Sequence, residues 1–104
     1  MARPLAIDLF CGLGGWTEGL LAEGWHVIGF DIERHVYGEH RYPAQLVVQD
    51  VLTLHGSQFR SADLIVSSPP CQGYSYRRRF ASAMIAKIPL PLARHIGRVF
   101  RPTS

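Results

Sequence analysis

The chain has 104 residues, which is enough for one small domain and no more. Hydrophobic residues make up 47% and charged residues 18%, a composition that excludes intrinsic disorder and is typical of globular proteins. No apolar run approaches the ~20 residues that span a bilayer, and the apolar stretch at the N-terminus meets Asp8 too soon for a signal peptide. We therefore expect a soluble, cytoplasmic protein.

Charge is unevenly distributed along the chain, whose net charge is +3. Residues 1–70 carry four basic and eight acidic side chains, whereas residues 71–104 carry seven basic side chains and no acidic one. Such a segment fits a polyanion partner, because lysines and arginines that neutralise phosphates release counterions. A solvated, poorly ordered tail explains the same charges equally well. The two cysteines and five histidines show no metal-ligand spacing, so no metal site is expected.

Short apolar runs alternate with turn signals over the first two thirds of the chain. Four runs are predicted to be buried strands, at residues 5–10, 25–30, 45–49 and 63–68. A helix is predicted at residues 16–24, because Trp16, Leu20 and Leu21 fall on one helical face. Residues 33–42 are predicted to be a short helical or irregular piece.

This succession predicts an α/β fold with a mostly parallel, doubly wound sheet of the Rossmann type. In such sheets the first and fourth strands are neighbours, and ligands bind beyond the carboxyl ends of the strands. The distinctive residues of this sequence lie at those ends: Gly12, Gly14, Asp31, Asp50 and Cys71. The pattern is lost after Ser75, although residues 91–100 could form a short helix with Pro91 at its first position.

The glycine-rich stretch "FCGLGGW" removes side chains where a backbone must come close to a ligand. A dinucleotide fingerprint would need a glycine at position 17, where this chain has Thr17, so an NAD site is disfavoured. Asp31 lies 19 residues after Gly12, where a carboxylate can accept both hydroxyls of a ribose. Asp50, at the third strand end, could accept from an adenine amino group. Each aspartate alone is explained as a surface or capping residue, but three successive strand ends in agreement favour a nucleoside-cofactor site.

The stretch "SSPPCQGYS" places Cys71 behind two prolines that fix the backbone. An unperturbed thiol has a pKa of about 8.5 and is only a few per cent thiolate at neutral pH. The arginines of "YRRRF" lie close in sequence and would raise that fraction. Residue chemistry alone leaves two interpretations of Cys71 open, a nucleophile on a rigid loop or an ordinary thiol beside a turn.

Four segments together resemble the first four motifs of the C5-cytosine DNA methyltransferases, in order and at similar spacing. They are "DLFCGLGGWTEGL" (8–20), "GFDIE" (29–33), "QDV" (49–51) and "SSPPCQGYS" (67–75). A fifth segment, "AKIPLPLARHIGR" (86–98), is similar to the family's closing motif. The resemblance implies an enzyme that uses S-adenosylmethionine, acts on DNA and works in a prokaryotic or phage-type intracellular setting.

The resemblance also implies a role for each matching residue. The cofactor-binding residues would be Phe10, Gly12, Leu13, Gly15, Asp31, Ile32, Asp50, Val51 and Pro70. Among them, Asp31 would hold the ribose, Ile32 would pack on adenine, and Asp50 with Val51 would bind the adenine edge. Cys71 would attack carbon 6 of a cytosine flipped out of the duplex, which makes carbon 5 nucleophilic enough to take the methyl group.

The family's later motifs have no counterpart in this sequence. The glutamate of the Glu-Asn-Val motif, the Arg-x-Arg motif and the target-recognition domain cannot be located, and no Asp or Glu follows Cys71. We therefore interpret residues 1–76 as the cofactor-binding and nucleophile-loop half of a methyltransferase catalytic domain, and residues 77–104 as a basic tail with a trace of the closing motif. Such a shortened chain could be inactive alone and depend on a second chain that carries the missing motifs. The alternatives are a non-catalytic module that binds the cofactor or DNA, and a different nucleotide-binding α/β protein such as a dehydrogenase fragment.

Overall fold

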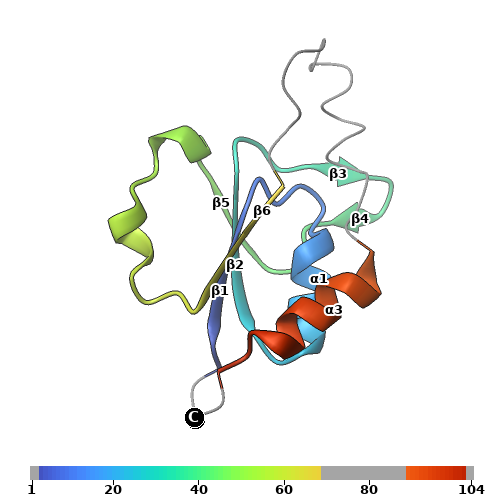
Figure 1. Ribbon diagram of the computed structural model, residues 1–104. Helices are drawn as coiled ribbons and strands as arrows, with labels where there is room; N and C mark the ends of the chain where they lie inside the picture. The colour runs from blue at the N-terminus through green and yellow to red at the C-terminus, as the bar shows by residue number, and fades with distance from the viewer. Residues whose placement is uncertain (1–2, 69–88, 103–104) are drawn as a thin grey trace.

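The computed structural model describes residues 3–68 and 89–102 of the chain. Its centre is a parallel sheet in the order β5-β2-β1-β6. The strands are β1 (Leu5–Leu9), β2 (His26–Asp31), β5 (Gln45–Val48) and β6 (Leu64–Ser67). β1 pairs with both β2 and β6, which gives the order of the first four strands of a doubly wound sheet. The predicted Rossmann-like α/β fold and the pairing of first and fourth strands are therefore confirmed (Figure 1).

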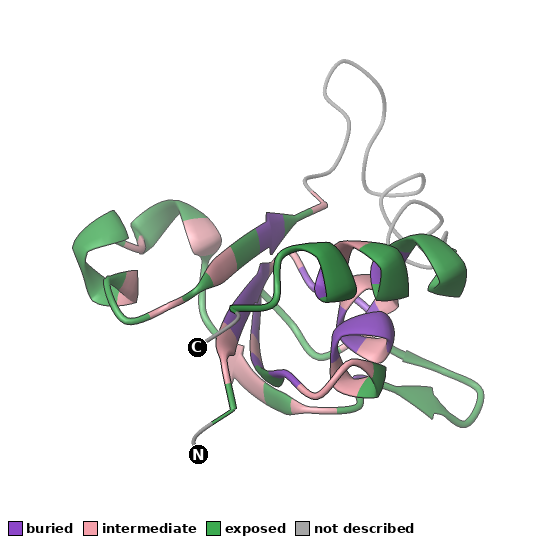
Figure 2. Cartoon of the chain, turned by 60° about the horizontal axis from the view of Figure 1, so that its bottom comes forward, coloured by how far each residue is buried: buried purple, intermediate pink, exposed green. Residues whose placement is uncertain are grey.

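Both faces of this sheet are apolar, as parallel strands require. One face carries Ala6, Val27 and Val66, and the helices α1 (Gly15–Ala22) and α3 (Leu90–Val99) lie side by side against it (Figure 1). The segment with the 3-10 helices η1 (Val51–Thr53) and η2 (Gly56–Phe59) lies on the opposite side. There the rings of Phe30 and Phe59 meet edge to face, with centroids 5.3 Å apart. Buried residues concentrate between the sheet and α1, whereas the segment around η1 and η2 is largely exposed (Figure 2).

Helices α1 and α3 pack closely because a glycine or an alanine stands wherever they touch. A Cβ atom on Gly19 would clash with the side chain and backbone of Ala93, which is itself fully buried. Beneath the two helices lies Trp25, also fully buried, and its Nε1 donates a hydrogen bond of 2.9 Å to the backbone oxygen of Gly97. The core on this face of the sheet is therefore completed by α3, which lies about 70 residues after α1 in the chain.

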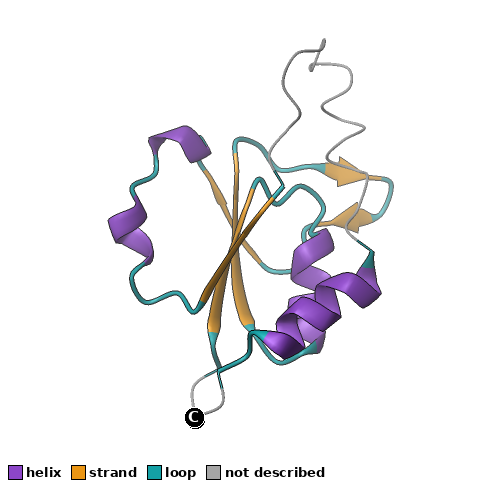
Figure 3. Ribbon diagram, in the orientation of Figure 1, coloured by secondary structure: helices purple, strands orange, loops and turns teal. Residues whose placement is uncertain are grey.

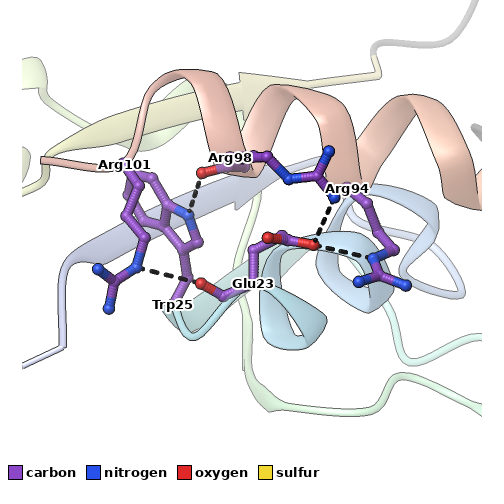
Figure 4. A network of polar contacts seen from close by, with 6 residues as sticks. Glu23, Trp25, Arg94, Arg98 and Arg101 are labelled. Carbon is purple, nitrogen blue, oxygen red and sulfur yellow. Dashed lines mark hydrogen bonds and ion pairs between the residues drawn. The ribbon is translucent and has the colours of Figure 1, made fainter.

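Polar contacts hold α3 in the same place (Figure 4). Arg94 Nε donates to Glu23 Oε2 over 2.9 Å, and Arg98 Nη2 reaches the same oxygen over 3.3 Å. Arg101 Nε donates to the backbone oxygen of Glu23 over 3.1 Å. We call these three side chains the Glu23 arginines. These contacts give the three side chains fixed positions, so for them a poorly ordered tail is wrong, while Arg94 and Arg98 stay solvated at 47% and 64% exposure.

Three element boundaries differ from the prediction. Residues 33–42 contain a two-stranded antiparallel ribbon, β3 (Val36–Tyr37) and β4 (His40–Arg41), and not a helical piece (Figure 3). Gly38, with φ of 61°, opens the two-residue turn between them, a signal that the sequence analysis overlooked. Helix α1 ends at Ala22, two residues early, and α3 begins at Leu90, so Pro91 is its second residue. No helix in the described part of the chain is long and apolar enough to cross a membrane.

Candidate functional site

The carboxyl ends of the strands meet at one edge of the sheet, which is the upper edge in Figure 1. The glycine turn, residues 10–14, leaves β1 there and leads into α1. Cys11 N donates to Phe30 O over 3.2 Å, and Gln49 N donates to Asp31 O over 2.8 Å. These two backbone bonds tie the end of β2 to the glycine turn on one side and to the end of β5 on the other. The predicted cofactor residues of the first three motifs are thus brought together.

The glycine turn needs a backbone conformation that few side chains allow. Gly12 and Gly14 have φ values of 54° and 90°, and Phe10, which is not a glycine, has a φ of 55°. Gly14 N donates to Cys11 O over 2.8 Å and closes the turn. Residues 11–14 of the turn are buried, Leu13 among them, and Phe10 is half-buried. Gly15, the last predicted residue of this motif, is half-buried as the first residue of α1.

Asp31 is the link between the turn and the second strand. Its carboxylate is 1% exposed; Oδ2 accepts from Gly12 N over 3.0 Å, and Oδ1 accepts from Ile32 N over 2.7 Å. His35 Nε2 also lies 3.4 Å from Oδ1. No pattern in the sequence predicts these backbone contacts, which fix the carboxylate next to the glycine turn. Glu33 N is a third backbone donor, 3.5 Å from Oδ1. A carboxylate has about four acceptor positions, so a ribose hydroxyl would have to share or replace one of these contacts.

The remaining predicted residues occupy different settings at the same edge. Ile32 is 58% exposed beside the buried Asp31, an arrangement that suits an apolar contact with a flat ring. Asp50 is exposed, and its Oδ1 accepts from Leu52 N over 2.9 Å, so it caps η1 as well as ending the β5 segment. Val51 is half-buried as the first residue of η1. Within the described residues, no group of three or more His, Cys, Asp or Glu side chains could hold a metal ion.

Pro70 and Cys71 lie outside the described residues, so the role predicted for them stays a prediction. The chain leading to them is described up to Ser68, whose backbone N donates to Leu9 O over 3.2 Å. This bond keeps the end of β6 beside the end of β1, at the edge that carries the glycine turn. The fourth motif therefore begins next to the first.

A buried polar cluster behind the glycine turn escaped the sequence analysis. Thr17 Oγ1 donates to Asp8 Oδ2 over 2.7 Å and lies 2.6 Å from the hydroxyl of Tyr42. Burial raises the pKa of Asp8 from 3.8 to about 7; the Thr17 hydrogen bond opposes this shift, and the charge of Asp31 adds to it. Burial likewise raises the pKa of Cys11, the thiol at the start of the turn. The available signal was an aspartate in the middle of an apolar strand, where an unpaired charge is costly.

Comparison with known proteins agrees with this architecture. The profile of the family described as "C-5 cytosine-specific DNA methylase" matches residues 5–83, well over half of the chain. No solved structure matches the chain significantly.

Three curated relatives are Type II methyltransferases of bacteria. M1.HphI of Haemophilus parahaemolyticus is 35% identical over 79 residues, which are 66% of this chain and 21% of that protein. M.DdeI of Desulfomicrobium norvegicum is 31% identical over 78 residues, 66% of this chain and 19% of that protein. M.XorII of Xanthomonas oryzae is 29% identical over 87 residues, 72% of this chain and 20% of that protein. The chain thus spans about a fifth of the length of the relatives it matches.

Proposed function

The chain belongs to the C-5 cytosine-specific DNA methylase family, and from that premise we propose that it serves the transfer of a methyl group from S-adenosylmethionine to carbon 5 of cytosine in DNA. In this proposal the described edge of the sheet binds the cofactor, and the segment that follows β6 supplies the nucleophile. Because the chain spans about a fifth of its relatives, the proposal concerns these two tasks and not the recognition of a target sequence.

The observation that carries the proposal is the hydrogen bond between Gly12 N and Asp31 Oδ2. It joins the glycine turn to the one buried carboxylate at the end of β2, so the two motifs form a single wall and not two separate turns. The cofactor has a ribose, an adenine and a charged amino-acid part. Along this wall, the Asp31 carboxylate corresponds to the ribose, the exposed Ile32 side chain to the adenine, and the glycine turn with Gly12 and Gly14 to the amino-acid part. The residues present therefore fit this cofactor.

Each residue has a defined task in the proposed complex. Asp31 would accept the ribose hydroxyls, while Gly12 N and Ile32 N hold its carboxylate next to the glycine turn. Ile32 would cover one face of the adenine, while Asp50 and Val51 would meet its edge. Phe10, Gly12, Leu13, Gly15 and Pro70 would surround the methionine part. When bound, the cofactor supplies an activated methyl group on sulfur.

The proposed nucleophile is Cys71, on the resemblance of its segment to the family's fourth motif. Its thiolate would form a bond to carbon 6 of the cytosine, moving electron density to carbon 5, which then takes the methyl group. Loss of the proton from carbon 5 and departure of the thiolate would release the product. Protonation of the ring during attack needs an acid. Such an acid contributes about 10²–10⁴-fold to the rate, and residues 72–104 contain no Asp or Glu that could supply it. Neither the described residues nor the relatives support the expectation of a second chain that supplies this acid.

Calorimetric titration tests the cofactor site. S-adenosylmethionine should bind saturably, NAD should not, and Asp31→Asn should weaken binding by about 1.5–3 kcal/mol, the scale of hydrogen bonds to a charged group. Asp63→Asn is the matched control, because its exposed carboxylate accepts from Leu5 N at the opposite end of the sheet. Binding of NAD in place of S-adenosylmethionine would refute the proposal and favour a dehydrogenase-like protein.

Covalent capture tests the nucleophile. In the presence of S-adenosylmethionine, a 5-fluorocytosine in a DNA duplex can accept the thiolate at carbon 6 and the methyl group at carbon 5 but cannot then lose fluorine from carbon 5. The thiolate adduct should therefore accumulate and shift the chain on a denaturing gel. Cys71→Ser should abolish this adduct and leave the affinity for S-adenosylmethionine unchanged. Cys11→Ala is the control, since Cys11 is the only other thiol of the chain and is buried. An adduct that survives Cys71→Ser would remove Cys71 from the mechanism. If no adduct forms while the cofactor binds, the chain is a non-catalytic cofactor-binding module.

A further inference from the structure

Tyr42 lies in the chain between β4 and β5, outside every motif of the sequence analysis, yet it is 6% exposed. Its ring occupies space that two glycines leave open. A Cβ atom on Gly29 of β2 would clash with the phenol ring, and one on Gly14 would come within 3.0 Å of Tyr42 Cδ1 and 2.7 Å of Pro43 Cδ. The ring is therefore wedged between the glycine turn and the second strand.

The hydroxyl of Tyr42 extends this contact into a directed chain. Thr17 has one hydroxyl proton, which it donates to Asp8 Oδ2 over 2.7 Å. Either hydroxyl can be the donor in the 2.6 Å contact between Thr17 Oγ1 and Tyr42; while Thr17 donates to Asp8, the contact uses the proton of the tyrosine. The chain runs from Tyr42 through Thr17, fully buried on α1, to Asp8, which is 1% exposed on β1. It joins the three segments that surround the base of the glycine turn.

We propose that Tyr42 is a positioning residue for the cofactor: through its ring and its hydroxyl bond to Thr17, it holds the glycine turn in the conformation that receives S-adenosylmethionine. This inference rests on the proposed function of the turn. Asp31 fixes the turn at Gly12, in its middle, and Tyr42 fixes it at Gly14, where it leads into α1, so the two residues act on different points of the same backbone stretch. Tyr42 itself need not touch the cofactor.

Removal of single oxygen atoms tests the proposal. Tyr42→Phe deletes the hydroxyl and keeps the ring, and it should weaken S-adenosylmethionine binding about tenfold, or about 1.4 kcal/mol. Thr17→Val should weaken it to a similar extent, whereas Thr17→Ser keeps the hydroxyl and should bind within about twofold of the unaltered chain. Tyr37→Phe is the matched control, because the Tyr37 side chain is 51% exposed in the β3–β4 ribbon. Titrations are made at a temperature where urea curves show each variant to be folded.

A second readout separates this inference from the proposed function. Amide hydrogen exchange of the unliganded chain should become faster at Gly14, whose N–H bonds Cys11 O, in Tyr42→Phe but not in Tyr37→Phe. Unchanged affinity and unchanged exchange in Tyr42→Phe, or a lower melting temperature with unchanged affinity, would overturn the inference. If the unaltered chain fails to bind S-adenosylmethionine, the proposed function fails and the cofactor role of Tyr42 fails with it. In that case the exchange rates still decide whether Tyr42 orders the turn.

Discussion

Replacing Asp8 by asparagine should change how stability depends on pH. Asp8 is 1% exposed in the middle of β1, Oδ2 accepts from Thr17, and Oδ1 is buried with no hydrogen-bond partner. Burial, with a smaller contribution from the charge of Asp31, raises the pKa of this carboxyl from 3.8 to about 7, against the Thr17 hydrogen bond, which lowers it. The folded chain therefore binds a proton that the unfolded chain has already released at neutral pH.

The sign and the size follow from that difference. Since the folded pKa is above the unfolded value, the contribution of Asp8 to the free energy of unfolding is highest below pH 3.8, falls as the pH rises to about 7, and is level above it. At about 1.4 kcal/mol for each pKa unit, the fall amounts to about 4 kcal/mol. The asparagine of Asp8→Asn does not titrate, so the unfolding free energy of this variant should lack this decrease with pH. Its buried amide would lack some hydrogen-bond partners, which lowers the unfolding free energy by about 1–3 kcal/mol at every pH.

Urea denaturation followed by tryptophan fluorescence at about pH 5 and about pH 8 measures the effect. The difference in unfolding free energy between the two pH values should be about 2–3 kcal/mol smaller in Asp8→Asn than in the unaltered chain, because only the part of the fall above pH 5 lies between them. Asp63→Asn, which removes an exposed carboxylate, should leave the difference unchanged. Parallel pH profiles for Asp8→Asn and the unaltered chain would show that Asp8 is already ionised in the folded state, and the argument from burial would be refuted.

Two further predictions concern the contact between α1 and α3. Gly19→Ala should lower the unfolding free energy by about 1–3 kcal/mol despite its better helix propensity, because its Cβ would clash with Ala93, whereas Gly56→Ala, with open space around it, should change it by less than about 0.5 kcal/mol. Equal urea midpoints for the two variants would show that α3 is not seated on α1. Glu23→Gln should remove an acid-sensitive part of stability. The hydrogen bond from Arg94, followed by that from Arg98, keeps the pKa of Glu23 below its ordinary 4.5, so this part is present above pH 4.5 and lost as the pH falls through the lowered pKa. Thermal melts between about pH 3 and about pH 6 that coincide for Glu23→Gln and the unaltered chain would contradict this.

The strand order was predictable because its signals are local. Each of the four strands is an apolar run next to a glycine, aspartate or proline, and parallel pairing of such runs follows from the crossovers between them. The placement of Asp31 beside Gly12 followed in turn, since both residues end strands that are neighbours in the sheet. The cofactor, S-adenosylmethionine, was predicted from the resemblance of the motifs to a known family and not from geometry.

The features that escaped prediction depend on contacts between distant segments. Nothing near Tyr42 in the sequence indicates that its ring fills the space over Gly29, and the bond to Thr17 spans 25 residues. Helix α3 was predicted only as a possibility, because its apolar face is meaningful only against Leu20 and Trp25 of the N-terminal segment. The β3–β4 ribbon was missed for a different reason, since a two-residue turn opened by Gly38 is itself a local signal.

The seating of α3 changes what the basic segment can do. Seven basic residues follow position 71, and three of them, the Glu23 arginines, are bound to one glutamate of α1. Contacts with DNA phosphates would then fall to the other four, Arg77, Arg78, Arg79 and Lys87. A plot of the logarithm of the DNA-binding constant against the logarithm of the salt concentration has a slope of about −0.9 for each neutralised phosphate. Four contacts should therefore give a slope of about −3.6, and seven contacts would give about −6.3. A slope near the larger value, measured by fluorescence anisotropy on a duplex, would mean that the Glu23 arginines leave Glu23 when DNA binds. Glu23→Gln should then strengthen DNA binding, whereas under the present argument it should leave the slope unchanged.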